Sequence, residues 1–116
     1  GALLVEDENK FIDQSRSLMY LATDVPQINP VPENVSAGPE TPIVKFASFL
    51  WKKPDVSFEA SQLHWRMNHG PLVRQVAETL RFKRYLQVHR YNSPIADGFR
   101  EVRSIPDAPV FGNAEI

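Results

Sequence analysis

The chain has 116 residues, the size of one ordinary domain, and its 13 Lys and Arg nearly balance its 14 Asp and Glu, which argues against a dedicated nucleic-acid-binding protein. It contains no cysteine, so disulfide scaffolds, thiolate nucleophiles and cysteine-ligated metal sites are excluded. No apolar run has the roughly 18 residues of a membrane span and the first residues show no signal-peptide pattern, so we expect a cytoplasmic protein without membrane contact.

The first 25 residues predict an acidic surface helix followed by a short strand. Glu6, Asp7 and Glu8 lie within the stretch 2–14, whose apolar residues recur at imperfect helical spacing. The run 17–22 is rich in bulky apolar residues and precedes Pro26, a pattern typical of a strand.

A proline-rich stretch comes next. Five of the chain's 10 prolines lie between Pro26 and Pro42. Each proline fixes its own φ and lacks an amide donor, so this stretch is neither a helix nor a central strand. We expect a linker over residues 26–42.

The remainder predicts alternating strands and helices. Residues 43–51 carry apolar side chains on both faces, which predicts a central strand. Ser57 is a natural N-cap for an amphipathic helix, and Gly70 and Pro71 predict a break with a second short helix after it. Residues 82–91 predict a second strand, 93–109 a loop, and 113–116 the start of a third strand. This order predicts an α+β protein with helices on one face of the sheet.

A cluster of polar and aromatic residues lies within the predicted helix, at 64–73. His64 and His69 are about 140° apart on a helix, so they do not share the face that a two-histidine metal site needs. His69 shares a face with Trp65 and lies beside Gly70. Two interpretations stay open: His69 caps exposed carbonyls at the helix end, or it serves as a general acid or base facing a pocket.

A second cluster lies on the strand 82–91. Strand alternation places Tyr85, Gln87, His89 and Tyr91 on one side of the sheet. This face is either solvated or lines an apolar cleft with a few hydrogen-bonding groups. No carboxylate lies at a ligand-like spacing from any histidine, so we expect no metal, and the sequence shows no Gly-rich phosphate loop or dinucleotide fingerprint.

These segments together resemble one known family. The resemblance rests on His64-Trp-Arg-x-x-His69-Gly-Pro-Leu-Val73, Arg84-Tyr-x-Gln-x-His89, Phe49-Leu-Trp-Lys-Lys-Pro54, Ser57-Phe-Glu59 and Gly112-Asn-Ala-Glu-Ile116. In this order and spacing they are similar to the EthD family of the dimeric α/β-barrel superfamily, over residues 43–116.

The N-terminal segment resembles the last helix and last strand of the same family, placed before the rest. The resemblance therefore divides the chain into the end of one unit at 1–25, a linker at 26–42, and strand–helix–strand plus the start of a third strand at 43–116. Two arrangements fit this order, a slice of a tandem protein and a permuted domain. We favour the tandem slice, because a strand that stops at Ile116 leaves the sheet incomplete.

The family implies a ferredoxin-like fold, in which a four-stranded antiparallel sheet carries helices on one face. Two such sheets pair through their open faces into a dimeric α/β barrel, as two copies or as two units of one chain. The open face, to which we assign Tyr85, Gln87, His89 and Tyr91, then lines an apolar cleft.

The resemblance also implies a function. It points to a cofactor-independent enzyme that dehydrates, cyclises or decarboxylates an aromatic or polyketide-like compound, with His69 and His89 as acid and base and Tyr85 as a hydrogen-bond donor to a substrate oxygen. The implied substrate-binding residues are Gln87, Tyr91, Trp65 and His64. The alternatives are an oxidoreductase-associated protein of ether or aromatic degradation, or a non-catalytic accessory protein that binds a hydrophobic ligand.

Overall fold

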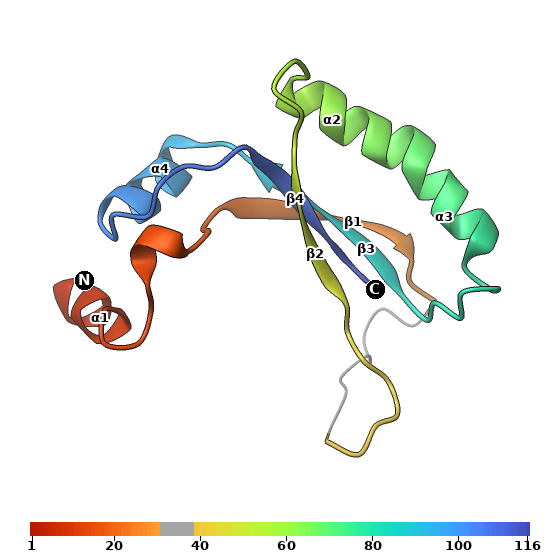
Figure 1. Ribbon diagram of the computed structural model, residues 1–116, viewed down its shortest axis with the longest axis horizontal. Helices are drawn as coiled ribbons and strands as arrows, with labels where there is room; N and C mark the ends of the chain where they lie inside the picture. The colour runs from red at the N-terminus through yellow and green to blue at the C-terminus, as the bar shows by residue number, and fades with distance from the viewer. Residues whose placement is uncertain (31–38) are drawn as a thin grey trace.

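The computed structural model of the chain describes residues 1–30 and 39–116 (Figure 1). These residues form one four-stranded antiparallel sheet with the strand order β1-β3-β4-β2. The strands are β1 (Leu21–Ile28), β2 (Ala47–Trp51), β3 (Tyr85–Tyr91) and β4 (Val110–Glu115). The predicted α+β class with an antiparallel sheet is therefore confirmed.

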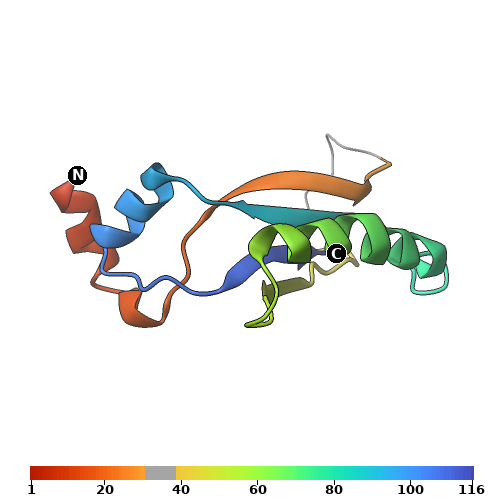
Figure 2. The same cartoon turned by 90° about the horizontal axis from the view of Figure 1, so that it is seen from above.

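The helices fall into two groups. One group is a single long helix, made of α2 (Phe58–His64), a π-helical turn (Trp65–His69) and α3 (Gly70–Val76). Figures 1 and 2 show this long helix running along one side of the sheet. The other group, α1 (Ala2–Glu8) and α4 (Pro94–Glu101), lies beyond one end of the strands, so only the long helix covers the sheet as predicted.

The strand order is that of a split β-α-β unit. The long helix connects β2 to β3, yet these two strands are not neighbours, because β4 pairs with both and lies between them. β1 pairs with β3 from Leu21, opposite Tyr91, to Ile28, opposite Tyr85. The N-terminal segment and the later strands thus belong to one sheet.

β2 is an edge strand, and the prediction of a central strand over 43–51 was wrong. The strand is shorter than expected and begins at Ala47. Phe49 and Trp51 are each 51% exposed. An unbroken apolar run is typical of a strand buried on both faces, but here the same run lies at an edge because β4 takes the place beside β3.

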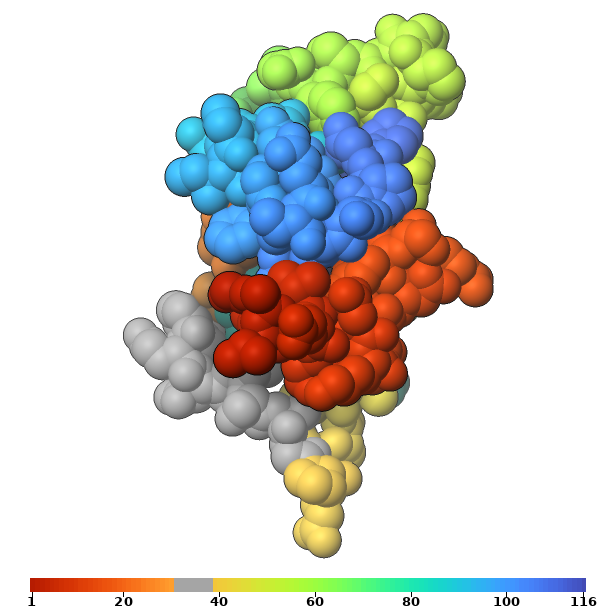
Figure 3. Space-filling view, turned by 90° about the vertical axis from the view of Figure 1, so that its left-hand side faces the viewer, coloured from red at the N-terminus to blue at the C-terminus, as the bar shows by residue number. Residues whose placement is uncertain are grey.

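β1 extends through Pro26 to Ile28, so the expected start of the linker at residue 26 was wrong. Proline is tolerated there because β1 is the other edge strand, and the pairing with β3 shifts register between Pro26 and Ile28. Of the rest of the expected linker, residues 31–38 lie outside the described residues. Residues 39–46, yellow in Figure 3, project from the body of the molecule.

The predicted cap of the long helix is confirmed, whereas the predicted break is not. Ser57 accepts a hydrogen bond from the amide of Ala60 at 3.0 Å. The helix then continues through Gly70 and Pro71. In the π-helical turn before them, the Gly70 amide donates to the carbonyl of Trp65, five residues earlier instead of four. A widened turn accommodates the proline that would interrupt a regular α-helix.

α4 was missed, because residues 93–109 were expected to form a loop. Ser93 caps this helix by accepting a hydrogen bond from the amide of Ala96, and Pro94 occupies the first turn. A bidentate ion pair links the turn after α4 to α1: Arg103 donates to Glu8 through Nε at 2.6 Å and Nη2 at 3.0 Å. Figure 3 shows the two helices in contact.

The molecule is thin and exposes a large surface. Its radius of gyration is 16.5 Å, compared with about 13 Å for a compact domain of this length. Its accessible surface is 8385 Å², compared with about 6,400 Å² for a compact monomer of this mass. In the described part of the chain, no helix has the length and apolar character needed to cross a membrane.

Candidate functional site

The polar side chains of β3 are buried beneath the long helix. Tyr85 is 1%, Gln87 0% and His89 8% exposed, and the helical residue Trp65 covers them at 5% exposure. The predicted alternation is confirmed for these three β3 residues, but their assignment to the open face was wrong. They lie on the helix side of the sheet, where the indole of Trp65 stacks on His89 and the carbonyl of Trp65 accepts from Gln87. We call Trp65, Tyr85, Gln87 and His89 the Gln87 network.

Hydrogen bonds from the Gln87 amide join the network. Gln87 Nε2 donates to the carbonyl of Trp65 at 2.8 Å and to Tyr85 Oη at 3.2 Å. Gln87 Oε1 lies 2.9 Å from His89 Nε2. Because both amide protons of Gln87 point at oxygen atoms, its Oε1 is left as the acceptor, and His89 Nε2 must carry the proton.

Aromatic rings enclose His89 on the helix side. The indole of Trp65 stacks on the imidazole with centroids 4.7 Å apart and planes 20° apart. Phe111 meets the same indole edge-on at 5.5 Å. The histidine therefore sits against an apolar aromatic wall while one of its nitrogens is fixed by an amide.

The π-helical turn presents the backbone to the network. The carbonyl of Trp65 accepts from both the Gly70 amide and the Gln87 side chain. A Cβ at Gly70 would lie 2.6 Å from Gln27 Oε1 and 3.2 Å from Gln87 Nε2, so a larger residue there would displace the end of the Gln27 side chain and press on the Gln87 amide. π-Helical turns often occur at functional sites, and here the turn places a carbonyl over Gln87.

A second glycine makes room on the sheet. A Cβ at Gly112 would lie 2.9 Å from the indole of Trp65 and would clash with the carbonyl of Val88. The position of Trp65 over the sheet thus depends on glycine in β4, which pairs with His89.

Gln62 is a structural contributor that the sequence analysis missed. Its Nε2 donates to the carbonyl of Arg90 at 2.8 Å and to that of Phe111 at 3.0 Å, which ties the start of the long helix to β3 and β4. A signal was present, because Gln62 precedes Trp65 by three residues and so lies on the same helical face.

Burial controls the charge of His89. Removal from water lowers the pKa of its imidazole from the ordinary value of 6.5, and the nearby positive charge of Arg66 lowers it further. The imidazole is therefore neutral at pH 7. Among the described residues no hydrogen bond reaches Nδ1, so this atom is left with an unshared electron pair.

The structure does not gather the other predicted site residues into this network. His64 and His69 are exposed on the long helix, and Tyr91 is 60% exposed at the end of β3. No hydrogen bond or ring contact joins His69 to His89 in the described part of the chain. Of the expected pair, His69 and His89, only His89 belongs to the Gln87 network. The described residues also contain no cluster of three potential metal ligands.

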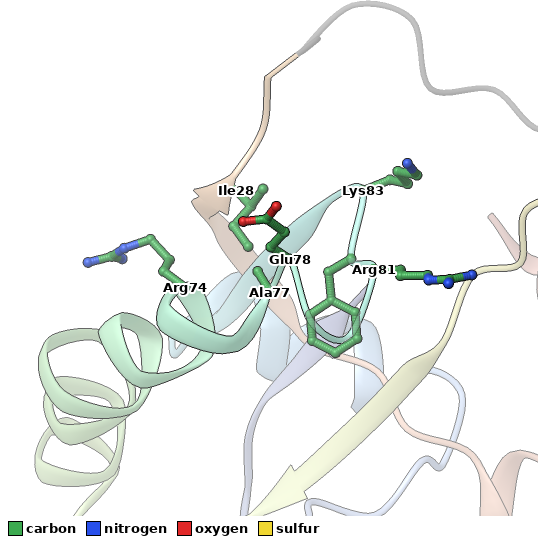
Figure 4. A pocket seen from close by; sticks show the side chains of 7 residues that line it. Ile28, Arg74, Ala77, Glu78, Arg81 and Lys83 are labelled. Atoms are coloured by element: carbon green, nitrogen blue, oxygen red, sulfur yellow. The ribbon is translucent and has the colours of Figure 1, made fainter.

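Two pockets lie away from the network. One, of about 570 Å³, is lined by Ile28 and by residues at the end of the long helix, among them Arg74, Glu78 and Arg81. Figure 4 shows the guanidinium groups pointing apart on either side of Glu78, so they do not converge on one ligand. The other, of about 830 Å³, is an apolar groove between α1 and α4.

Comparison with protein-family models, with curated proteins and with solved structures finds no match to this chain.

Proposed function

We propose that this chain is an EthD-like small-molecule enzyme in which His89 acts as the base. The observation that carries the proposal is the state of His89: neutral, fixed as the Nε2–H tautomer by Gln87, and with Nδ1 unbonded among the described residues. Nδ1 takes a proton from a C–H or O–H acid beside a carbonyl. The Nε2–H bond to Gln87 Oε1 then stabilises the imidazolium that forms.

The surroundings favour an aromatic or polyketide-like substrate. Trp65 stacks on the imidazole and Phe111 packs edge-on against the same indole, so the surroundings of His89 are apolar and aromatic, which suits a conjugated substrate. The proposed reactions are dehydration, cyclisation or decarboxylation, each of which begins or ends with proton transfer at such a group.

Tyr85 has a different role in this proposal from the one the family implies. It is 1% exposed and its oxygen accepts the second amide proton of Gln87. We infer that Tyr85 is a positioning residue that fixes the orientation of the Gln87 amide and, through it, the His89 tautomer.

We further propose that a second sheet covers the face of this sheet that the long helix leaves open, as the ferredoxin-like dimeric α/β barrel requires. Two observations support it. The chain exposes about 2,000 Å² more than a compact monomer, which exceeds the roughly 800 Å² that each partner buries in a standard protein interface. Phe49 is half exposed. It pairs with Asn113, which pairs with Val88, so all three lie on the face of the sheet opposite the Gln87 network.

The position of β1 favours the tandem slice over the permuted domain. A complete ferredoxin-like unit places its last strand beside the edge strand that begins the unit, which is β2 here. β1 instead pairs with β3 at the opposite edge. We therefore propose that β1 belongs to a neighbouring unit and is shared between the two sheets.

Proton transfer can be tested directly with 2,4-pentanedione in D₂O, by following the loss of its C3 proton signal by NMR. We expect the chain to accelerate exchange above the buffer rate and His89→Ala to lower this acceleration about 100-fold. His89→Gln provides a second variant that keeps a polar side chain at the buried position. Gln75→Ala, at an exposed position of α3, is the control substitution.

Equal exchange rates in the parent and in a folded His89 variant would contradict the proposed base. Saturable binding of the diketone without exchange would favour the non-catalytic ligand-binding protein. Sedimentation of the parent chain tests the pairing of sheets, because a monomer at all concentrations would exclude pairing between two copies.

A further inference from the structure

The long helix leaves part of β1 uncovered on the side of the sheet that carries the Gln87 network. Leu21 pairs with Tyr91 and Thr23 pairs with His89. Directly paired residues of an antiparallel sheet point to the same face, so Leu21 and Thr23 share the face of His89. Leu21 is 37% exposed and Thr23 is also exposed. The Gln87 network therefore borders on solvent along β1.

Arg66 lies on the long helix at the level of His89. Four residues before Arg66, Gln62 bonds to the carbonyl of the residue that follows His89. Four residues after Arg66, Gly70 lies against the side-chain amide of Gln87, two residues before His89. Residues four apart share a helix face, so the position of Arg66 falls between these two contacts with β3.

The side of the helix that carries Arg66 faces β1. Gly70 and Arg74 follow Arg66 at intervals of four residues, which places all three on one side of the helix. A Cβ at Gly70 would lie 2.6 Å from the side-chain oxygen of Gln27, a residue of β1. Arg74 donates a hydrogen bond to the same oxygen. Arg66 therefore lies on the β1 side of His89.

Arg66 is an exposed cation whose charge is not used within the described part of the chain. No hydrogen bond or ion pair reaches its guanidinium there, whereas Arg74, on the same side of the helix, is bonded to Gln27. The positive charge of Arg66 lowers the pKa of His89, in agreement with their positions. A guanidinium in this state can bind a carboxylate through two parallel hydrogen bonds.

Thr23 supplies a hydroxyl group beside the same histidine. Its Cβ lies about 5 Å from that of His89, as directly paired residues do. Among residues 1–30 and 39–116, no hydrogen bond involves this hydroxyl, so its proton can be donated to a ligand. A cation, a hydroxyl donor and a base thus meet at the uncovered part of β1.

We propose that the substrate is an oxo carboxylic acid whose carboxylate binds to Arg66, an inference that rests on the proposed function because it adds a binding group to the same base. Nδ1 of His89 takes the proton of the C–H beside the carbonyl, and the C–H electron pair moves into the enolate. The Thr23 hydroxyl donates a hydrogen bond to the enolate oxygen. In D₂O the imidazolium exchanges this proton with solvent and returns a deuteron to the carbon.

Two diketones that differ only in charge test the proposal on the whole chain. 4,6-Dioxoheptanoate carries a carboxylate, and its methyl ester is the neutral counterpart with the same exchanging protons on C5. Exchange in D₂O, followed by NMR over a range of diketone concentrations, gives KM and kcat for each. We expect the KM of the acid to be at least about tenfold lower than that of the ester, because only the acid pairs with the guanidinium.

Substitutions separate Arg66 from the other charges of the helix. Arg66→Gln should raise the KM of the acid about tenfold without changing that of the ester, and Arg66→Lys should restore part of the difference. It should also raise the pKa of His89 in an NMR titration, because a nearby positive charge is removed. Arg74→Gln removes the same charge from the same side of the helix and should change neither quantity. Thr23→Val should lower kcat for both diketones about fivefold and leave the KM of the acid unchanged.

Equal KM values for acid and ester, an unchanged KM of the acid in Arg66→Gln, or an equal effect of Arg74→Gln would each overturn the proposal and leave His89 as the base. If no diketone exchanges faster than in buffer, the proposed function fails, and binding of 4,6-dioxoheptanoate, followed by the NMR signal of the Trp65 indole, decides on Arg66. Tighter binding of the acid than of the ester, lost in Arg66→Gln, would support the carboxylate site. Equal binding of the two would overturn it.

Discussion

Replacing Gln87 with Leu tests the most buried polar group of the molecule. The substitution nearly preserves volume but removes the amide that bonds to Trp65, Tyr85 and His89. The carbonyl of Trp65 keeps its bond from the Gly70 amide. Tyr85 Oη and His89 Nε2 are left buried with no replacement partner from the leucine.

The magnitude follows from the number of bonds. Three buried hydrogen bonds contribute about 1 kcal/mol each, so Gln87→Leu should lower the free energy of unfolding by about 3 kcal/mol. For a chain of this length that corresponds to a fall in Tm of about 12 °C. Gln75→Leu, at an exposed position of α3, should change stability by less than about 0.5 kcal/mol.

Chemical denaturation of the parent, Gln87→Leu and Gln75→Leu provides the measurement. The m-value should be the same for all three, so that the change in midpoint reports stability alone. If the free energy of unfolding of Gln87→Leu is within about 0.5 kcal/mol of the parent value, roughly the scatter of surface substitutions, the Gln87 hydrogen bonds do not stabilise the fold.

Three further predictions concern His89, Gly112 and Glu8. The folded-state pKa of His89 lies below 6.5, so the unfolded chain binds the proton first as the pH falls. The contribution of His89 to stability is therefore full above pH 6.5 and is lost as the pH drops from 6.5 towards the folded pKa. His89→Gln should remove this pH dependence from the free energy of unfolding measured by denaturation. Gly112→Ala should cost about 1–3 kcal/mol by overpacking against the carbonyl of Val88 and the indole of Trp65, measured as a fall in Tm, and an unchanged Tm would contradict these close contacts. Hydrogen bonds from Arg103 lower the pKa of Glu8, so Glu8→Gln should speed amide exchange in α1 while leaving β3 protected; equal exchange in both proteins would mean that the ion pair does not hold α1.

Local signals predicted the parts of the fold that depend on neighbouring residues. Ser57 was recognised as a cap because its hydroxyl satisfies an amide three residues on. The alternation that places Tyr85, Gln87 and His89 on one face follows from strand geometry alone and is confirmed.

Signals that depend on tertiary structure were misjudged. Alternation shows which residues share a face but not which face the helix covers, so the β3 residues were assigned to the open side. Leu72 and Val76 are apolar residues of the long helix, yet they are 59% and 45% exposed. Apolar spacing alone therefore does not show which side of the helix is buried. The central position expected for residues 43–51 failed for the same reason.

Two errors came from local chemistry that was present but not used. Ser93 and Pro94 form a cap and first turn for α4, and this signature was outweighed by the other prolines of 93–109. Pro71 was expected to begin a new helix, but the π-helical turn absorbs it, and that turn is what brings the carbonyl of Trp65 to Gln87.

The proposed function depends on the protonation state of His89, which nitrogen-15 NMR of the histidine rings measures most directly. Correlations from the ring protons to both nitrogens distinguish the two neutral tautomers and the protonated form. We expect a neutral His89 at pH 7 with the proton on Nε2, and loss of this preference in Gln87→Leu. A protonated ring, or the proton on Nδ1, would contradict this expectation.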